Sequence, residues 1–457
     1  MVGEYLGTNT IRQLGMLLRV GEITVQDLIS ESLSSIRQGE DLKAFISVFD
    51  REATNAAIAY QSLLANGYDL GPLHGMPIAI KDNIDYAYGS TTYGSSIFRE
   101  HKAAEDATVV KRLKAAGAII VGKTNLHEFA WGGTTSNPHY GTARNPWDKE
   151  RIPAGSSGGS GIAVAKRMVC SALGTDTGGS IRLPSAMDGV CGIRPTLGDT
   201  SIDGIFPVAW SMDTVGPLCS NAEDVELMFS IMSGRSEKLT PAVPADLSRL
   251  RIGIIEDYSL EGLQPDVRNA FSTMLGLCES KGAQIVPVRL QGLDEVVDAQ
   301  LVVDAVEPSA VHYRLIKERT NDYGKDVLSR LLAGCAITGV EYVQAQRFRE
   351  HFRKLVAEMF KAVDIVLTPT LPFTAPRIGS TTVEIEQGKS VSALSGNMRY
   401  TAIPSMSGIP AMSVPIGHDA EDLPIGMQIM VPAHREDLAF SFAKAYQEIT
   451  EFHRERP

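Results

Sequence analysis

The chain has 457 residues, of which 44% are hydrophobic and 21% are charged, and its formal net charge at pH 7 is −11. This composition is typical of a folded globular protein and does not predict disorder. An acidic chain without a basic run is a poor candidate for nucleic-acid binding, which needs clustered Lys and Arg against phosphate. No basic leader precedes an apolar run at the start, and no apolar stretch approaches the roughly 20 residues of a membrane helix. We therefore expect a cytoplasmic protein with no nucleic-acid or membrane partner.

The cysteines are odd in number and scattered, and no CxxC pair occurs among them. This usage predicts buried free thiols in a reducing compartment. The absence of a Cys/His cluster also gives no indication of a metal site. The five cysteines are Cys170, Cys191, Cys219, Cys278 and Cys335.

Strand and helix patterns alternate in the first half of the chain. Thr24 with Asp27 resembles a capping pair and predicts a helix over residues 24–37, and residues 50–66 are also helical in pattern. A short apolar run predicts a strand that ends at Lys81. The next predicted elements are a helix at 107–118, a strand at 118–122, a short helix at 125–132, a helix at 160–168, a strand at 169–176 and a turn into a helix at 177–186. Such alternation indicates a sheet with helices on its faces.

Later elements are less regular. Strands are expected at residues 250–255, 363–370, 409–417 and 424–431, and helices at 264–281 and 341–361. Residues 234–250 form the only plausible internal linker, and we interpret them as a surface loop.

The stretch GAIIVGKT (117–124) matches the phosphate-binding loop pattern G-x-x-x-x-G-K-[ST]. Such a loop needs a strand before its first glycine and loop residues between its glycines, so that backbone N–H groups surround the phosphate. Here a predicted helix precedes Gly117, and the next four residues are Ala-Ile-Ile-Val. The pattern therefore predicts a helix–turn–strand junction, and a nucleotide-binding protein is only a remote alternative.

Two glycine-rich stretches carry candidate nucleophiles. Ser156 and Ser157 lie in AGSSGGSG (154–161), which has the composition of a linker but runs directly into an apolar helical pattern. Ser180 follows two glycines in GTDTGGSIR, where a strand meets a helix. Glycines at this position let backbone N–H groups converge, as an oxyanion hole requires. A serine also needs a base to become a nucleophile.

The residues alone leave the identity of the base open. His74, His127 and His139 occur in no diagnostic setting and are expected to be structural. Lys81 can act as a base only if burial or a cationic neighbour lowers its pKa. Taken by itself, it would be interpreted as a solvated surface side chain.

Three stretches together resemble the amidase signature family: GMPIAIKDNID (75–85), RIPAGSSGGSG (151–161) and LGTDTGGSIRLPSAMDGVCGIRPT (173–196). The resemblance is dense over about residues 70–220 and continues more thinly through DIVLTPTLPFTAP, SGIPAMSVPIG and LPIGMQIMVP. It implies one α/β/α domain over residues 1–457, with a mixed central sheet covered by helices on both faces. The catalytic core would span about 70–220, and a more variable, substrate-shaping region about 220–360.

The family uses a Lys base, a relay Ser preceded by a cis peptide and a second, nucleophilic Ser, which map onto Lys81, Ser156 and Ser180. Ser180 would attack an amide carbonyl and form an acyl-enzyme, which water then releases as the acid. The oxyanion would be held by the N–H groups of Thr177, Gly178, Gly179 and Ser180.

Several flanking residues are assigned supporting roles by the same resemblance. Where the family more often has Gly-Gly before the paired serines, this chain has Ala154-Gly155, and the small Ser157 follows. We interpret this as a variant that keeps the cis bond at Gly155–Ser156. Asp176 and Arg182 are expected to form a buried ion pair, with contact between Arg182 and a substrate carboxylate as the alternative.

Trp131 with Gly132 and Gly133 would lie near the site, where Trp131 either stacks on substrate or packs in the core. The residues that shape the acyl pocket are expected mostly in 200–215 and 295–350.

The resemblance implies an amidase that hydrolyses a C–N bond of a small-molecule amide and needs no metal and no cofactor. The alternative is the amidase subunit of a tRNA-dependent amidotransferase, which would release ammonia from glutamine for a partner. Both a homodimer and an assembly with a small partner subunit fit the sequence, and the substrate class (acyl amide, aryl amide, urea-like bond or hydrazide) is left open.

Overall fold

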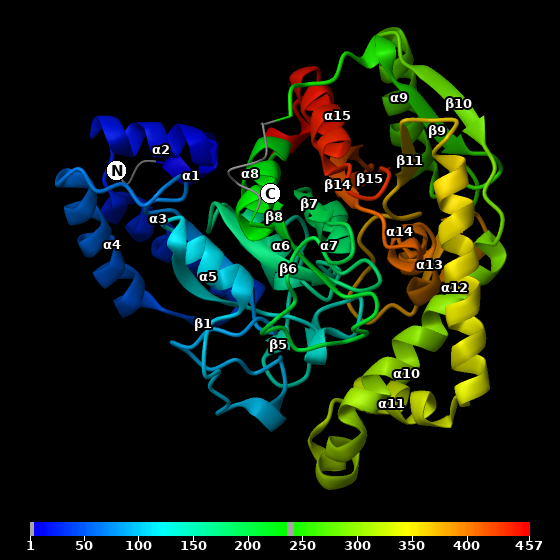
Figure 1. The fold of residues 1–457 in the computed structure, drawn as a ribbon, viewed down its shortest axis with the longest axis horizontal. Coiled ribbons are helices and arrows are strands. Elements are labelled where there is room, and N and C mark those ends of the chain that lie inside the picture. The colour runs from blue at the N-terminus through cyan, green and yellow to red at the C-terminus, as the bar shows by residue number, and fades with distance from the viewer. Residues whose placement is uncertain (1–3, 235–241) are drawn as a thin grey trace.

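A central mixed sheet of eleven strands organises the structure, a computed structural model that describes residues 4–234 and 242–457 (Figure 1). In chain order its strands are β1 (Phe45–Val48), β2 (Pro77–Lys81), β3 (Ile119–Thr124), β6 (Ser171–Asp176), β7 (Cys191–Arg194), β8 (Thr214–Cys219), β9 (Arg251–Ile255), β10 (Gln284–Val288), β11 (Ile365–Pro369), β14 (Ala411–His418) and β15 (Pro424–Met430). Two small hairpins are β4 (Ser136–Asn137) with β5 (Gly141–Thr142), and β12 (Thr382–Glu386) with β13 (Lys389–Ser392).

The order of strands across the sheet is β1–β3–β2–β6–β8–β7–β14–β15–β11–β9–β10. β3, β2 and β6 are parallel to one another, as are β11, β9 and β10, and the strands between these two groups pair antiparallel. The predicted mixed sheet is therefore confirmed. Because β2 and β6 are parallel neighbours, their carboxyl ends lie at the same edge.

Helices pack against the sheet along its length (Figure 1). In chain order, the helices of the described residues, including those that pack mainly on other helices, are α1 (Tyr5–Thr8), α2 (Ile11–Val20), α3 (Val25–Gln38), α4 (Asp50–Ala65), α5 (Thr108–Ala115), α6 (Gly158–Ala165), α7 (Arg182–Asp188), α8 (Ala222–Met232), α9 (Pro265–Ser280), α10 (Leu293–Arg319), α11 (Lys325–Ala336), α12 (Gly339–Met359), α13 (Ala393–Met398), α14 (Ala402–Ser407) and α15 (Glu436–Glu448). Short 3-10 turns lie at Glu40–Leu42, Ser96–Phe98, Glu128–Ala130, Leu247–Arg249, Thr320–Asp322 and Phe452–Arg454.

α6 and α7 pack on the centre of the sheet from one side, α8 and α15 pack on it from the other, and α10, α11 and α12 pack together at one end of the molecule. The central strands β2, β3, β6, β8 and β15 are buried at every residue, which places the main core on both faces of the sheet.

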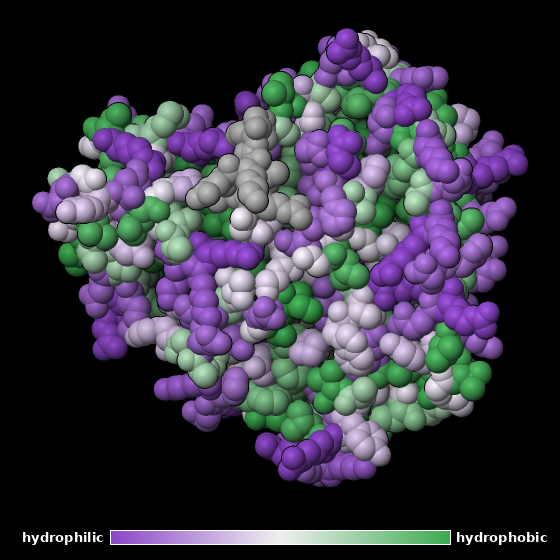
Figure 2. All heavy atoms as spheres, in the orientation of Figure 1, coloured by the Kyte–Doolittle hydropathy of each residue, from purple (hydrophilic) through white to green (hydrophobic). Residues whose placement is uncertain are grey.

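Hydrophilic residues cover most of the outer helices in the view of Figure 2, with smaller hydrophobic patches between them. Among the described residues, no helix combines the length and apolar character needed to cross a membrane.

Several local predictions are confirmed, and three need correction. Thr24 caps α3 and exchanges hydrogen bonds with Asp27, as its sequence indicates. The helix predicted at 125–132 is wrong: Phe129 and Ala130 have φ values of 54° and 59°, and the segment makes only a 3-10 turn. The N–H of Phe129 donates to the carbonyl of Tyr93 (2.8 Å) instead of continuing a helix.

The second correction concerns a cysteine. The other four cysteines are buried and free, but Cys335 is exposed, because α11 turns its neighbours Leu331 and Gly334 inward. The third concerns α10, a helix of 27 residues that the sequence patterns did not predict. The predicted loop at 234–250 lies partly outside the described residues, which omit 235–241.

Candidate active site

The predicted base lies at the carboxyl end of β2 and is fully buried. Lys81 Nζ donates hydrogen bonds to Ser156 Oγ (2.7 Å) and to Thr175 Oγ1 (2.8 Å). The interpretation of Lys81 as a surface side chain is therefore wrong. Burial lowers the pKa of Lys81 to about 7, although the charges of Asp176 and Asp213 oppose this shift. A large fraction of the amine is thus neutral near pH 7 and able to accept a proton.

The loop before α6 holds Ser156 against this amine. The Gly155–Ser156 peptide is cis, as the resemblance implied, and Ser156 is fully buried. A Cβ atom on Gly155 would lie 2.8 Å from the carbonyl oxygen of Gly132, so this close approach requires glycine. The preceding Ala154 takes a left-handed conformation with a φ of 59°.

Ser157 joins the two serine-bearing loops. Its N–H donates to the carbonyl of Ser180 (3.2 Å), and its hydroxyl donates to the carbonyl of Thr175 (3.2 Å). Ser157 therefore positions the backbone on both sides of Asp176, and its contacts do not reach the pocket described below.

The predicted nucleophile, Ser180, lies in the turn between β6 and α7 and is partly exposed. The N–H of Gly179 donates to Asp176 Oδ1 (3.0 Å) and is thus committed to the turn. In the described ranges, the N–H groups of Thr177, Gly178 and Ser180 donate to no protein acceptor. These three amides are free to bind a ligand oxygen, whereas Gly179 shares its donor with Asp176.

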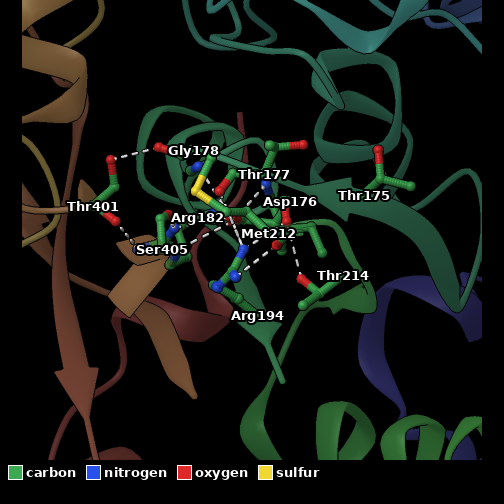
Figure 3. Close-up of polar contacts among 12 residues, drawn as sticks. Thr175, Asp176, Thr177, Gly178, Arg182, Arg194, Met212, Thr214, Thr401 and Ser405 are labelled. Atoms are coloured by element: carbon green, nitrogen blue, oxygen red, sulfur yellow. Dashed lines mark hydrogen bonds and ion pairs between the residues drawn. The ribbon is translucent and has the colours of Figure 1, made fainter. Parts of the chain in front are cut away.

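A buried charge cluster fixes this turn (Figure 3). Asp176 Oδ1 lies 2.8 Å from Arg182 Nη2 and 3.2 Å from Arg194 Nη1, and all three side chains are inaccessible to solvent. Burial alone would raise the pKa of Asp176, but the two guanidinium groups hold it well below its usual range. The predicted ion pair is confirmed.

The remaining donors of Arg182 are also occupied, which argues against contact with a substrate carboxylate. Besides Asp176, it donates to the carbonyl of Thr401 (3.0 Å), to Ser405 Oγ (2.9 Å) and to Gln428 Oε1 (2.6 Å). Arg194, which donates to the carbonyls of Asp176 (2.6 Å) and Met212 (2.7 Å), was not singled out from the sequence. The available signal was its place in GIRPT (192–196), the last part of the third stretch that resembles the family.

A pocket of about 270 Å³ opens beside Ser180. Its walls are formed by Ala130, Trp131, Gly132, Gly133, Gly155, Thr177, Gly178, Ser180, Leu183, Val208, Gln300, Leu301, Asp304, Ala305, Arg330, Ala333, Leu394, Asn397 and Met398. The expected stretches 200–215 and 295–350 supply part of this wall, and α13 supplies a part that was not expected. Trp131 lies in the wall with the Arg330 guanidinium 5.3 Å from its ring centre, so one face of the ring is already covered.

The other candidates make structural contacts. His74 bonds to the backbone of Leu70 and Tyr60, His127 lies 2.7 Å from Asp326, and His139 lies 2.7 Å from Glu128. The described residues contain no group of three or more His, Cys, Asp or Glu side chains placed to hold a metal ion.

The stretch at 117–124, which matches the phosphate-binding loop pattern, is a helix–turn–strand junction, as predicted. Residues 119–124 form the buried strand β3, and Lys123 lies 3.3 Å from Asp82 with both side chains inaccessible to solvent. Its backbone is extended in the sheet and cannot surround a phosphate.

Comparison with known proteins places this architecture in one family. The Amidase family model matches residues 27–439, and the chain therefore belongs to the amidase family. It is 35% identical to a Glutamyl-tRNA(Gln) amidotransferase subunit from Ralstonia nicotianae, over 98% of this chain and 99% of the relative.

Solved structures agree with this assignment. A crystal structure of an amidase superposes with a TM-score of 0.91 at 30% identity, over 96% of this chain and 99% of that one. A chain from a vestigial protein complex that reveals the evolutionary origins of an s-triazine catabolic enzyme superposes with a TM-score of 0.90 at 32% identity, over 96% of this chain and 98% of that one. The predicted family and α/β fold are thus confirmed.

Proposed function

We propose that this chain hydrolyses the C–N bond of a small amide through an acyl-enzyme on Ser180. The observation that carries the proposal is the contact of the buried Lys81 amine with Ser156 Oγ at 2.7 Å. A lysine whose pKa is lowered to about 7 is matched to general-base work at neutral pH. Family membership supports this chemistry, since it is the class of reaction that the matched model describes.

In the proposed mechanism, neutral Lys81 accepts the proton of Ser156, which in turn accepts the proton of Ser180. Ser180 Oγ attacks the amide carbonyl, and the negative oxygen forms hydrogen bonds with the free amides of the 177–180 turn. The proton returns through Ser156 to the leaving nitrogen, the C–N bond breaks, and water hydrolyses the resulting ester to the acid.

Labelling with a fluorophosphonate probe tests this assignment. The probe should modify Ser180, and Ser180→Ala should abolish the modification, whereas Ser230→Ala on α8 should leave it unchanged. Lys81→Met should slow labelling by about 10²–10⁴-fold, the usual contribution of a general base. Labelling that persists in Ser180→Ala, or that depends on His127 and not on Lys81, would contradict the mechanism.

The pH dependence of the labelling rate is a second test of the same mechanism. Because the active form of Lys81 is the neutral one, the labelling rate should rise about tenfold per pH unit below pH 7 and level off above it. A profile that is flat from pH 5 to pH 9 would count against a lysine base.

A second candidate function is the amidase subunit of a tRNA-dependent amidotransferase, which would hydrolyse glutamine and pass ammonia to a partner. The full-length similarity to Glutamyl-tRNA(Gln) amidotransferase subunits supports this alternative more than a free-standing amidase. Both candidates use the same triad and differ in substrate and assembly.

Ammonia release by the purified chain separates the two candidates. A free-standing amidase should hydrolyse small amides alone, at a rate that added partner chains do not change. An amidotransferase subunit should be slow on glutamine alone and accelerate when copurified with a partner chain. Turnover of small amides without glutamine turnover in either preparation would exclude the amidotransferase role.

A further inference from the structure

One buried carboxylate joins two loops that form the pocket wall. Thr177 Oγ1 donates to Asp213 Oδ1 at 2.5 Å. The N–H of Val208 donates to Asp213 Oδ2 (2.9 Å), and the N–H of Ala209 donates to Asp213 Oδ1 (3.2 Å). Thr177 and Val208 line the cavity beside Ser180, whereas Asp213 is buried and contributes nothing to the lining. The Asp213 carboxylate therefore holds the nucleophile turn and the loop of Val208 together.

The sheet places Asp213 beside Thr177. β8 begins at Thr214, which pairs antiparallel with Asp176, the last residue of β6. Carried one residue further, this register puts Asp213 opposite Thr177, the first residue of the turn. The hydroxyl of Thr214 also donates to the carbonyl of Asp176 (3.0 Å), which joins the two strand ends (Figure 3). The contact between Asp213 and Thr177 thus extends the pairing of the strands into the turn.

The peptide groups at the start of the turn are held by their carbonyl oxygens. Arg194 Nη1 donates to the carbonyls of Asp176 (2.6 Å) and Thr177 (3.2 Å). Both peptide bonds are trans, so their N–H groups point to the side opposite their carbonyls. These N–H groups belong to Thr177 and Gly178, and they donate to no acceptor within residues 4–234 and 242–457. Arg194 therefore determines the side to which both free amides point.

The Cα atom of Thr177 connects these two peptide groups. Rotation about its two backbone bonds changes the angle between the N–H groups of Thr177 and Gly178. Arg194 restrains the carbonyls, and the hydrogen bond to Asp213 restrains the Thr177 side chain and with it this Cα atom. The donors of an oxyanion hole must converge on one point, about 2.7–3.1 Å from the developing oxyanion. The angle at Thr177 therefore decides how well both amides reach that point.

We propose, on the basis of the amidase function proposed above, that Asp213 is a positioning residue that acts through the Thr177 hydroxyl to aim the free N–H groups of Thr177 and Gly178 at the oxyanion. Asp213 itself touches none of the reacting atoms. Its contribution arises when negative charge forms on the oxygen of the attacked group. Loss of the bond between Thr177 and Asp213 should therefore slow the reaction of a bound probe without weakening its binding.

Two valine variants separate this role from a structural one. Thr177→Val removes the hydroxyl that donates to Asp213. Thr196→Val is the matched control, because the buried Thr196 Oγ1 donates to Oε1 of the buried Glu436 at 2.6 Å, and neither residue lines the pocket. Each variant loses one buried hydrogen bond from threonine to a carboxylate, so both should lower the urea midpoint of unfolding by a similar amount.

The rate of Ser180 labelling by the fluorophosphonate probe is then measured over a range of probe concentrations, which separates the binding constant KI from the rate constant kinact. Thr177→Val should lower kinact by about 10–10²-fold and change KI by less than about threefold, since small misplacements of catalytic groups cost up to about 10²-fold. Thr177→Ser keeps the hydroxyl and should restore kinact to within about threefold of wild type. Thr196→Val should leave both constants unchanged.

Asp213→Asn tests the other partner of the bond. Its amide has one oxygen and cannot accept from the hydroxyl of Thr177 and both loop N–H groups, so kinact should fall by about tenfold or more. The charge of Asp213 also acts on the pKa of Lys81, so labelling is measured at pH 9, where Lys81 is neutral in every variant. The double variant Thr177→Val/Asp213→Asn should be no slower than the slower single variant, because both act through one hydrogen bond.

Equal kinact values for Thr177→Val and Thr196→Val would overturn the inference, as would a Thr177→Ser variant as slow as Thr177→Val. Losses that multiply in the double variant would overturn the assignment to this hydrogen bond. If Thr177→Val does not fold, Asp213→Asn compared with Thr196→Val decides in the same way. In each case the acyl-enzyme proposal stands if the probe labels Ser180 in the wild-type chain, and absence of that labelling would overturn both.

Discussion

Two buried polar clusters lie on either side of the Gly178 turn, and they differ in how far the protein itself satisfies them. Around Asp176, each of the five N–H donors of Arg182 meets an acceptor from the same chain. Around Asp304, the oxygens Asp304 Oδ1 and Gln300 Oε1 meet no donor among the described residues. The first cluster holds the nucleophile turn in place before any ligand arrives, while the second keeps two buried oxygens without a hydrogen-bond donor.

This difference separates two roles that are often combined under the term active site. A fully paired charge network rigidifies the backbone that carries the chemistry. An unpaired set lowers the stability of the folded protein. Variants that change the pairing of each cluster should therefore alter stability in opposite directions.

The largest effect is expected from Arg182→Met, which leaves the buried Asp176 carboxylate with only one cationic partner. Breaking a buried ion pair in this way should lower the free energy of unfolding by about 3–5 kcal/mol, measured by urea denaturation. Arg251→Met is the matched control, because Arg251 pairs with Asp364 at the same 2.8 Å but on the exposed surface. Its loss should stay below about 1 kcal/mol. Equal losses in the two variants would contradict the role of the buried cluster.

An opposite and smaller effect is expected from Asp304→Asn. Burial raises the pKa of Asp304 to about 7, so the folded state binds a proton that the unfolded state has already released between about pH 4 and pH 7. The wild-type carboxyl therefore reduces stability progressively as pH rises through this range. Asp304→Asn should raise the free energy of unfolding by about 1–3 kcal/mol at pH 7 and by much less at pH 5.

Urea denaturation of wild type and Asp304→Asn at both pH values measures this gain. The exposed Asp298→Asn on α10 should show no gain at either pH. A destabilised Asp304→Asn at pH 7 would mean that the carboxylate is already paired in the free protein, and the contrast between the clusters would fail.

The smallest effect is expected at Ala154, beside the cis peptide. A left-handed alanine costs about 1–2 kcal/mol, which glycine would relieve. Loss of a buried methyl group, about 0.8 kcal/mol, and the greater chain entropy of glycine oppose this gain. Ala154→Gly should thus change the free energy of unfolding by less than about 1 kcal/mol, whereas Ala163→Gly, buried within the helix α6, should lower it by about 2 kcal/mol. Thermal or urea denaturation of both variants checks this difference.

The parts of the molecule that could be predicted from the sequence are those in which neighbouring residues determine the geometry. Lys81 and Ser180 follow strands with clear apolar patterns, and parallel strands bring their carboxyl ends together. The glycines around Ser156 lie where other segments of the chain approach closely, which few other residues permit. Capping at Thr24 is equally local.

The remaining parts depend on contacts between distant segments. α10 has buried residues around much of its circumference and contains Pro308, so the helical period of its hydrophobic residues is hidden. The pairing of Arg182 with Thr401 and Gln428 spans more than 200 positions, and nothing in the local sequence indicates it. For the same reason, the position of Asn397 in the pocket wall could not be predicted from the sequence.

The bond from Arg182 to Gln428 crosses 246 residues, and this span has a consequence for synthesis. A ribosome adds roughly 5–20 residues per second, so the two partners emerge roughly 10–50 seconds apart. During that interval the nascent chain holds both serines and the lysine but lacks the strand that completes the nucleophile turn. The newly made protein should therefore gain its reactive serine late, close to release of the full chain.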